Sequence, residues 1–523
     1  MRTGTPALAD FGYDAPTVMR MPFVFAVAIV LGGALFSACV GDDPGSGGSS
    51  SGTSGSSGSS GSSGTSGTSG APEGCKPDEK QCDGICVKKD DPKYGCGADT
   101  CTAPCQGTGA PNTVPSCNAG ACATGCAPGF DDCDGDLKNG CETNTQTEVA
   151  NCGKCGNKCG DAHATAKTCT AGMCVFTCEA GWLNCASDAD GCNKNVATDA
   201  QNCGKCGRDC LGGTCSNREC SILTLASGQL KPNALAVDGT SVYFVNEGNG
   251  VVNKMNKDGT GLGTIVPFAS GVESPQAIAT DGTNIFWANY NVSAARKLRR
   301  ASITGAAPAD VDVSHGTFSG FLAMGGGKVV WTNRYGTDHV YKADANGTNV
   351  AIVATGNFEP GWVAADATHI YWASYGNATI YKTPIGAGPC TMGNGGTCQV
   401  LTTANSVYAL AIDANNVYFT ELVATGAVRK ISKNGGAVTT LATGQPVPQT
   451  IATDGVHVYW GNFGNAAGGT SIRRAKVDAP ASCAAAGCEH VATLNFPNSI
   501  ALDDKAIYFV DQYSGGGVFR RAK

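Results

Sequence analysis

The stretch Pro275-Gln-Ala-Ile-Ala-Thr-Asp281, followed after a short turn by Ile285-Phe286-Trp287, decides the fold of this chain. It has the form Pro-x-x-[Ile/Leu]-Ala-x-Asp, a polar turn, and then a run of β-branched and aromatic residues. Short apolar runs of this kind, bounded by Gly, Asp and Asn, are typical of paired β-strands. The sequence therefore predicts two adjacent antiparallel strands at this position.

The same pattern recurs along the second half of the chain at a spacing of about 43 residues. That spacing fits a unit of four short strands, which is one blade of a β-propeller. We therefore expect an all-β, seven-bladed β-propeller over residues 221–523. The seven copies begin at Pro232, Pro275, Phe321, Pro360, Val407, Pro448 and Pro497, and the copy over 321–327 is degenerate.

The ends of this region predict how the ring closes. Residues 222–228 resemble 439–444, the expected outermost strand of a later unit, and three strands follow the start of the seventh unit. The N-terminal strand is expected to complete the last blade, because this pairing removes a free sheet edge.

The repeat resembles that of the YWTD and NHL propeller families, in which Pro-x-x-Ile-Ala-x-Asp leads into Ile-Tyr-Trp-Thr-Asp. Val329-Val330-Trp331-Thr332-Asn333 comes close to the second motif, whereas the other copies drift at its last two letters. The resemblance covers the whole of 221–523 and implies the propeller fold. It implies no activity, because propellers serve many functions.

Residues 75–220 form a different region, which contains 24 of the 29 Cys. The run Asn151-Cys-Gly-Lys-Cys-Gly-Asn-Lys-Cys159 returns as Asn202-Cys-Gly-Lys-Cys-Gly-Arg-Asp-Cys210, and an earlier copy is more diverged. These runs resemble the stigma-specific protein family and similar modules of secreted, myxobacterial-type proteins. Disulfides, zinc and redox chemistry could each use such spacing, and the Cys content favours disulfides in an oxidising compartment.

The N-terminal segment predicts export and a lipid anchor. Phe23–Phe36 is an apolar run too short to span a bilayer, and it suits a signal peptide. Leu35-Phe36-Ser37-Ala38-Cys39 resembles a bacterial lipobox, although Phe36 departs from the usual residue there. We expect a signal peptide over 1–38, acylation of Cys39 that joins the protein to a lipid bilayer, and a flexible Gly/Ser/Thr tether over 39–74.

Composition excludes several classes of function. A net charge of −7 argues against nucleic acid as a partner, and 29 Cys argue against a reducing cytosol. We expect a bacterial cell-envelope lipoprotein, on the outer membrane or cell surface. One acidic turn in the Cys-rich region, with Asp132, Asp134 and Asp136, is a weak Ca²⁺ candidate beside the alternative of a solvated turn; no other cofactor is expected.

One face of the propeller is the candidate binding surface. If the strands of a blade are called a to d from the inside outward, the b–c loops and the starts of the a strands share one end of the ring. Aromatic and polar residues gather in these b–c loops, which suits a glycan or a peptide, although packing between blades is the alternative for each ring. The candidates are Tyr290, Asn333, Arg334, Tyr335, Tyr375, Phe463, Asp511 and Tyr513.

The sequence favours binding over catalysis. No Gly-x-Ser-x-Gly, His-x-x-x-His or phosphate loop occurs, and the repeated Asp residues suit hydrogen-bonded turns. We therefore expect a non-enzymatic binding module, with a metal-dependent lyase or hydrolase and a purely structural envelope protein as alternatives. The remaining Cys are expected to form two local staples in c–d loops, Cys390 with Cys398 and Cys483 with Cys488.

Overall fold

The computed structural model describes most of the chain from Cys75 to Lys523. The residues outside the description are 1–74, 98–99, 187–188, 267–273, 290–297, 306–307, 313–320, 334–337, 357, 465–469, 479–482, 485–487 and 513–514. Cys39, the signal peptide and the tether therefore lie outside the described residues. Within the described part, no helix is long and apolar enough to cross a membrane.

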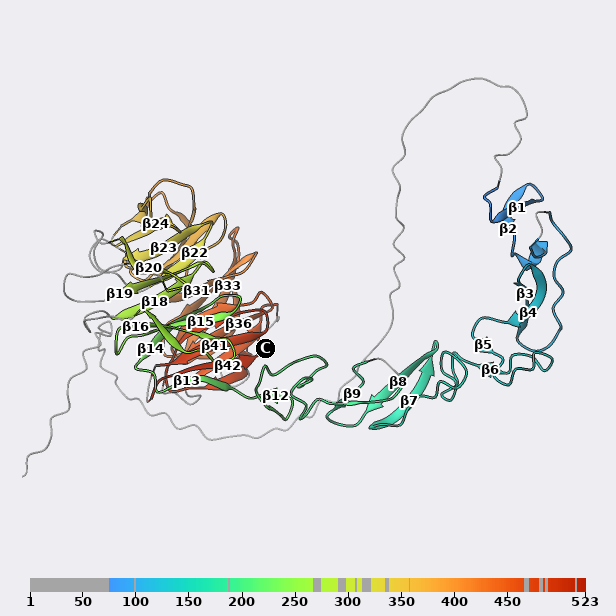
Figure 1. Cartoon of the computed structure of the whole chain (residues 1–523). Helices are drawn as coiled ribbons and strands as arrows, with labels where there is room; N and C mark the ends of the chain where they lie inside the picture. The colour runs from blue at the N-terminus through green and yellow to red at the C-terminus, as the bar shows by residue number, and fades with distance from the viewer. Residues whose placement is uncertain are drawn as a thin grey trace, which may run out of the picture. The chain divides into compact units, whose positions relative to one another are not determined.

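The predicted all-β, seven-bladed propeller is confirmed (Figure 1). The blades, each from its inner strand a to its outer strand d, are β14 (Pro232–Val237), β15 (Ser241–Asn246), β16 (Val251–Asn256), β17 (Gly263–Val266); β18 (Pro275–Thr280), β19 (Asn284–Asn289), β20 (Leu298–Ser302), β21 (Ala309–Asp312); β22 (Leu322–Gly325), β23 (Lys328–Asn333), β24 (His339–Asp344), β25 (Ala351–Thr355); β26 (Pro360–Ala365), β27 (His369–Ser374), β28 (Thr379–Pro384), β30 (Gln399–Thr403); β31 (Val407–Ile412), β32 (Asn416–Glu421), β33 (Gly426–Ser432), β34 (Thr439–Gln445); β35 (Pro448–Thr453), β36 (His457–Asn462), β37 (Ser471–Lys476), β39 (Glu489–Thr493); and β40 (Pro497–Leu502), β41 (Ala506–Asp511), β42 (Gly517–Ala522), β13 (Leu223–Ser227).

The ring is held by one apolar core at each contact between neighbouring blades. Each of these seven cores combines side chains of two adjacent blades, and the innermost strands pack against one another all the way round. The b strands are buried on both faces, so aromatic residues such as Tyr243 and Trp287 are fully enclosed. The repeated [Val/Ile]-Tyr-[Phe/Trp] run is therefore the packing element of each blade.

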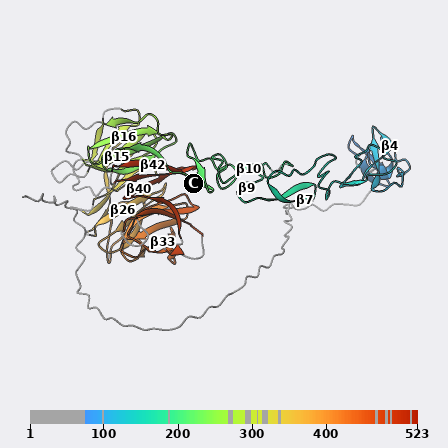
Figure 2. The ribbon, with the colours of Figure 1, turned by 90° about the horizontal axis from the view of Figure 1, so that it is seen from below.

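The ring closes as the sequence predicts. Strand β13 pairs with β42 in antiparallel register, with Leu223 opposite Arg520, so the first strand completes blade 7. Figures 1 and 2 show this meeting of distant segments, with the C-terminal strand β42 in red beside the green strands that begin the propeller.

The alignment of the degenerate third copy was wrong by two residues. Leu322 lies opposite Trp331, as Ile278 lies opposite Trp287, so Leu322 and not Met324 takes the place of the repeat's [Ile/Leu]. Phe321 therefore corresponds to Ala277 of blade 2 rather than to its Pro275. The three glycines after Met324 imitate the end of the motif, but the strand pairing follows the apolar residues.

Two blades carry a fifth strand that the sequence did not reveal. The c–d loop of blade 4 forms β29 (Cys390–Thr391), which pairs in parallel with β25 of blade 3. The c–d loop of blade 6 forms β38 (Cys483–Ala484), which pairs in parallel with β34 of blade 5. The structure joins Cys390 to Cys398 and Cys483 to Cys488, so each disulfide holds a loop that covers the outer edge of the preceding blade.

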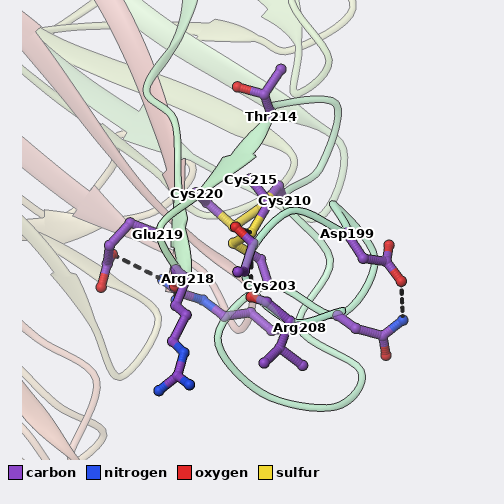
Figure 3. Close-up of a disulfide and its surroundings, with 12 residues drawn as sticks. Asp199, Cys203, Arg208, Cys210, Thr214, Cys215, Arg218, Glu219 and Cys220 are labelled. Atoms are coloured by element: carbon purple, nitrogen blue, oxygen red, sulfur yellow. Dashed lines mark hydrogen bonds and ion pairs between the residues drawn. A yellow bond between two sulfur atoms is a disulfide. The ribbon is translucent and has the colours of Figure 1, made fainter. Parts of the chain in front are cut away.

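The Cys-rich region consists of three repeats of eight Cys, Cys75–Cys122, Cys126–Cys174 and Cys178–Cys220, joined by disulfides. In every repeat the first Cys pairs with the third, the second with the fifth, the fourth with the seventh and the sixth with the eighth. Eight Cys allow on the order of 100 pairings, so the same choice in three repeats marks one structural unit. Figure 3 shows two bonds of the third repeat, Cys203–Cys215 and Cys210–Cys220.

Little regular structure accompanies these bonds, because each repeat has few apolar residues to form a core. The elements of the region are β1 (Glu79–Cys82), β2 (Ile85–Lys88), η1 (Pro92–Tyr94), β3 (Thr113–Asn118), β4 (Ala121–Cys126), β5 (Phe130–Asp131), β6 (Thr143–Asn144), β7 (Ala164–Thr170), β8 (Met173–Cys178), β9 (Trp182–Leu183), β10 (Lys194–Asn195), β11 (Cys215–Ser216) and β12 (Glu219–Cys220).

Candidate binding site at the rim of the ring

The candidate site lies at the end of the ring where the innermost strands begin. Because the strands of a blade are antiparallel, the b–c loops reach this same end, which we call the rim face. The second residue of each inner strand, after the Pro slot, lies here, and it differs from blade to blade. In the six regular copies these residues are Asn233, Gln276, Gly361, Tyr408, Gln449 and Asn498.

Four aromatic rings form one side of the rim face, and we call them the aromatic arc: Phe321, Trp362, Tyr375 and Tyr408. Tyr375 and Tyr408 stack in parallel with ring centroids 5.0 Å apart, and Phe321 lies 4.8 Å from Trp362. Phe321 also meets the edge of Tyr408 at 6.5 Å, although the two belong to blades 3 and 5, which are not neighbours. This contact past blade 4 directs the rings toward the inside of the ring. All four side chains are half-buried.

Gly361 creates the space for this arrangement. A Cβ atom at Gly361 would lie 2.0 Å from Cζ of Tyr375. The Tyr375 ring comes from the b–c loop of the same blade and occupies the place that a side chain of residue 361 would take. A glycine in strand β26 therefore allows a loop tyrosine to fold inward and stack on the next blade.

Polar side chains of blades 7 and 1 form the second side of the rim face, the polar arc. The amide of Gln512 donates a hydrogen bond to Oε2 of Glu247 at 3.1 Å, and the amide of Asn233 donates to the same oxygen at 3.5 Å. Asn498 donates to the backbone carbonyl of Asn233 at 3.0 Å. Glu247 and Gln512 are the first residues of their b–c loops, so loop and inner-strand residues meet here as they do in the aromatic arc.

Gln449 connects the two arcs along the ring, since its amide donates to the hydroxyl of Tyr408 at 3.5 Å. Aromatic faces stack on the apolar face of a sugar ring or on an apolar side chain. Carboxylate and amide groups bind hydroxyl or peptide groups. The rim face therefore offers both kinds of contact that a glycan or a peptide requires.

The structure separates the sequence-predicted site residues into three groups. Tyr375 belongs to the aromatic arc, whereas Phe463 packs edge-on against Phe496 with ring centroids 3.6 Å apart. Asn333 and Asp511 end their b strands and are only 2% and 7% exposed. The Asp511 carboxylate accepts the backbone N–H groups of the d–a connection at Asn495 and Phe496. The remaining candidates lie outside the described residues: Tyr290, Arg334, Tyr335 and Tyr513.

Sequence reasoning missed the inner-strand part of the site. Trp362 and Tyr408 stand in strands that otherwise repeat a core pattern, so they look like packing residues. The signal that could have found them is variation, because the Pro, Ala and Asp positions recur while the residues between them change from copy to copy. Positions that vary between repeats are free of the constraint of building a blade.

The repeated Asp residues lie at the opposite end of the ring and act as turn residues. Asp366 accepts the N–H groups of Thr368 and His369, the hydroxyl of Tyr371 at 3.2 Å, and the ammonium of Lys433 at 2.7 Å. Burial alone would raise its pKa, but Lys433 and the turn N–H groups prevail and hold the pKa of Asp366 well below its usual range. The equivalent Asp residues of five other blades make the same turn contacts: Asp238, Asp281, Asp413, Asp454 and Asp503.

Lysines from the following blade hold two more of these carboxylates. Lys257 of blade 1 donates to Asp503 of blade 7 at 2.6 Å, and Lys523 of blade 7 lies 3.0 Å from Asp454 of blade 6. Both pairs border an open cavity of about 430 Å³ at this end of the ring. The contacts explain the repeated Asp as a link between blades, as the sequence analysis favoured.

The acidic turn of the second Cys-rich repeat gathers Asp132, Asp134 and Glu142 within 4.8 Å, whereas Asp136 bonds to the N–H of Lys138. Among the described residues, the other groups of potential metal ligands are Cys residues that form disulfides, such as Cys152 and Cys159. The Ca²⁺ prediction therefore stays a prediction, with Glu142 in the place expected for Asp136.

Comparisons with known proteins concern the fold. No family profile and no curated protein sequence matches the chain. Among solved structures, a chain of the nidogen/laminin complex is 19% identical over 42% of this chain and 84% of its own length, with a TM-score of 0.34. YCF48 bound to D1 peptide is 9% identical over 58% of this chain and 96% of its own, with a TM-score of 0.41. Oligogalacturonate lyase in complex with manganese is 11% identical over 58% and 92%, with a TM-score of 0.43. The functions of these proteins are not transferred to this chain.

Proposed function

We propose that this protein is an envelope-anchored bacterial lipoprotein whose propeller binds a glycan or a peptide at the rim face. The observation that carries the proposal is the division of the rim face into an aromatic arc and a polar arc, both built by residues that vary between blades. Residues needed only for the blade recur in the copies, so the varied residues are available for recognition.

The anchor rests on separate observations. Every Cys in the described part of the chain forms a disulfide, which is typical of an extracytoplasmic protein and leaves no thiol there for Cys39. Cys39 follows the small residues Ser37 and Ala38 at the end of an apolar run, as an acylated Cys does. Acylation of Cys39 therefore accounts for the odd number of Cys.

The test is binding of the full, oxidised chain to arrays of neutral oligosaccharides and of unmodified peptides. We compare wild type with Trp362→Ala and Tyr408→Ala in the aromatic arc. Trp182→Ala is the control, since Trp182 stacks on His163 in the Cys-rich region. We expect one ligand class to bind, and each rim variant to weaken that binding by about tenfold or more while the control binds normally.

Two results would contradict the proposal. Absence of binding to both arrays would favour a structural envelope protein, and binding that both rim variants retain would place the site elsewhere. Cleavage of array oligosaccharides on addition of Ca²⁺ or Mn²⁺ would favour the metal-dependent lyase or hydrolase.

A further inference from the structure

The third Cys-rich repeat contacts the propeller exactly where the ring closes. Strand β13 follows Cys220 directly, and its first residues lie beside the end of β42. A bulge at Thr224 and Ala226 interrupts this pairing. The end of the β13–β42 pair is therefore the place at which the ring would begin to open.

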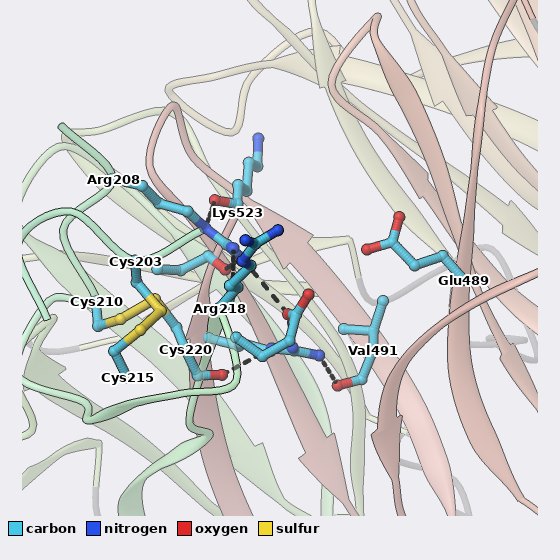
Figure 4. A network of polar contacts seen from close by, with 12 residues as sticks. Cys203, Arg208, Cys210, Cys215, Arg218, Cys220, Glu489, Val491 and Lys523 are labelled. Carbon is cyan, nitrogen blue, oxygen red and sulfur yellow. Dashed lines mark hydrogen bonds and ion pairs between the residues drawn. A yellow bond between two sulfur atoms is a disulfide. The ribbon is translucent and has the colours of Figure 1, made fainter. Parts of the chain in front are cut away.

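Two arginines fix both strands of this pair to the repeat (Figure 4). Arg208 of the repeat donates to the backbone carbonyls of Lys523 at 2.6 Å and Ala522 at 3.3 Å. Arg521 of β42 donates to the carbonyl of Cys220 at 3.0 Å and forms an ion pair with Glu219. The side chains of Arg208 and Arg521 are only 11% and 12% exposed, so these contacts are shielded from water.

Further contacts extend the junction to the neighbouring blades. Arg521 also donates to the carbonyl of Val491 in blade 6, and Arg520 donates to Leu211 of the repeat and to Lys257 of blade 1. Ala522 packs with the buried Cys210 and Cys220 in one small core. The repeat thus holds blades 6, 7 and 1 together at the seam of the ring.

Comparison with the second repeat shows that these contacts are specific to the third. Arg208 occupies the slot of Asn157, whose amide returns to the carbonyl of Cys152 within its own repeat. Glu219 occupies the slot of Met173, which is 67% exposed. The disulfides of the two repeats have the same connectivity, so the polar residues that reach the propeller are what distinguishes the third repeat.

We infer that the third repeat is a disulfide-held clasp on the seam of the propeller rather than the last unit of a spacer. The Cys210–Cys220 bond fixes Arg208 and Glu219 on either side of the entry to β13 (Figure 3). Reduction of this bond would free that entry, so closure of the ring would depend on an oxidising environment.

The test is thermal unfolding of the full chain, followed by tryptophan fluorescence, since all Trp except Trp182 lie in the propeller. We expect Cys210→Ser/Cys220→Ser to lower the propeller Tm by about 5 °C or more. The matched control is Cys159→Ser/Cys174→Ser, which removes the equivalent bond of the second repeat and should shift the propeller Tm by less than about 1 °C.

A second variant keeps every disulfide. Arg208→Asn with Glu219→Met gives the third repeat the residues of the second, and we expect the propeller Tm to fall by about 3 °C or more. Equal shifts for the two Cys variants, or an unchanged Tm for the Asn/Met variant, would overturn the proposal. If the Cys210/Cys220 variant fails to fold, the Asn/Met variant alone decides.

Discussion

Gly361 is the residue whose replacement most sharply separates the rim site from the fold. Gly361→Ala keeps the backbone of β26 but places a methyl group where the Tyr375 ring lies. We expect a folded propeller in which ligand affinity falls about tenfold, because Tyr375 can no longer stack on Tyr408. Isothermal titration measures this, with Gly386→Ala as the control, since no atom lies within 4 Å of a Cβ there. Equal affinity in the two variants would contradict the role given to Tyr375.

The Asp–Lys links between blades predict the response to acid. The pKa of Asp366 is lowered on folding, so its contribution to stability is complete above about pH 5 and is lost as the pH falls through about 4 and below. Asp366→Asn removes this contribution at neutral pH, and its Tm should fall less than that of wild type between pH 5 and pH 3. Parallel Tm curves for the two proteins would contradict this assignment.

Residue-level reasoning from sequence found Tyr375 and the turn role of the Asp residues, because both stand in loops between clearly repeated strands. It did not find Gly361, Trp362 or Tyr408. Their significance depends on which side chains face one another across the ring, and spacing along the chain does not contain that information.

At the scale of elements, disulfide-held loops cover the outer edges of two blades. Cys390→Ser/Cys398→Ser should lower the free energy of unfolding by about 2–3 kcal/mol, as expected for opening a short loop. Release of β29 would also expose the edge strand β25. Urea unfolding of wild type and variant measures the difference, and an unchanged midpoint would show that β29 pairs without the disulfide.

The strands themselves were largely predictable, since each repeat combines a turn signal with a buried aromatic run. Blade 3 shows why this has a limit. Three consecutive glycines imitate the motif's end, while the actual register follows the pairing of Leu322 with Trp331. The added strands β29 and β38 were not predictable, because they join blades through loops that carry no strand pattern.

For the whole molecule, the lipid anchor is testable apart from the propeller. Cys39→Ser removes the acylation site, so the exported protein should move from the detergent phase to the aqueous phase in Triton X-114 partition. Incorporation of labelled palmitate should disappear with it. Ala38→Ser, which leaves Cys39 and a small residue before it, is the control. Detergent partition of the Cys39→Ser protein would contradict the anchor.

The most direct test of the central claim is a fluorescence titration with the ligand that the arrays identify. Four propeller tryptophans are fully buried, whereas Trp362 is half-buried on the rim face. The account predicts a saturable change in emission on binding, and loss of that change in Trp362→Phe, which keeps an aromatic ring and part of the affinity. An unchanged emission in wild type at saturating ligand, or an equal change in Trp362→Phe, would contradict binding at the rim face.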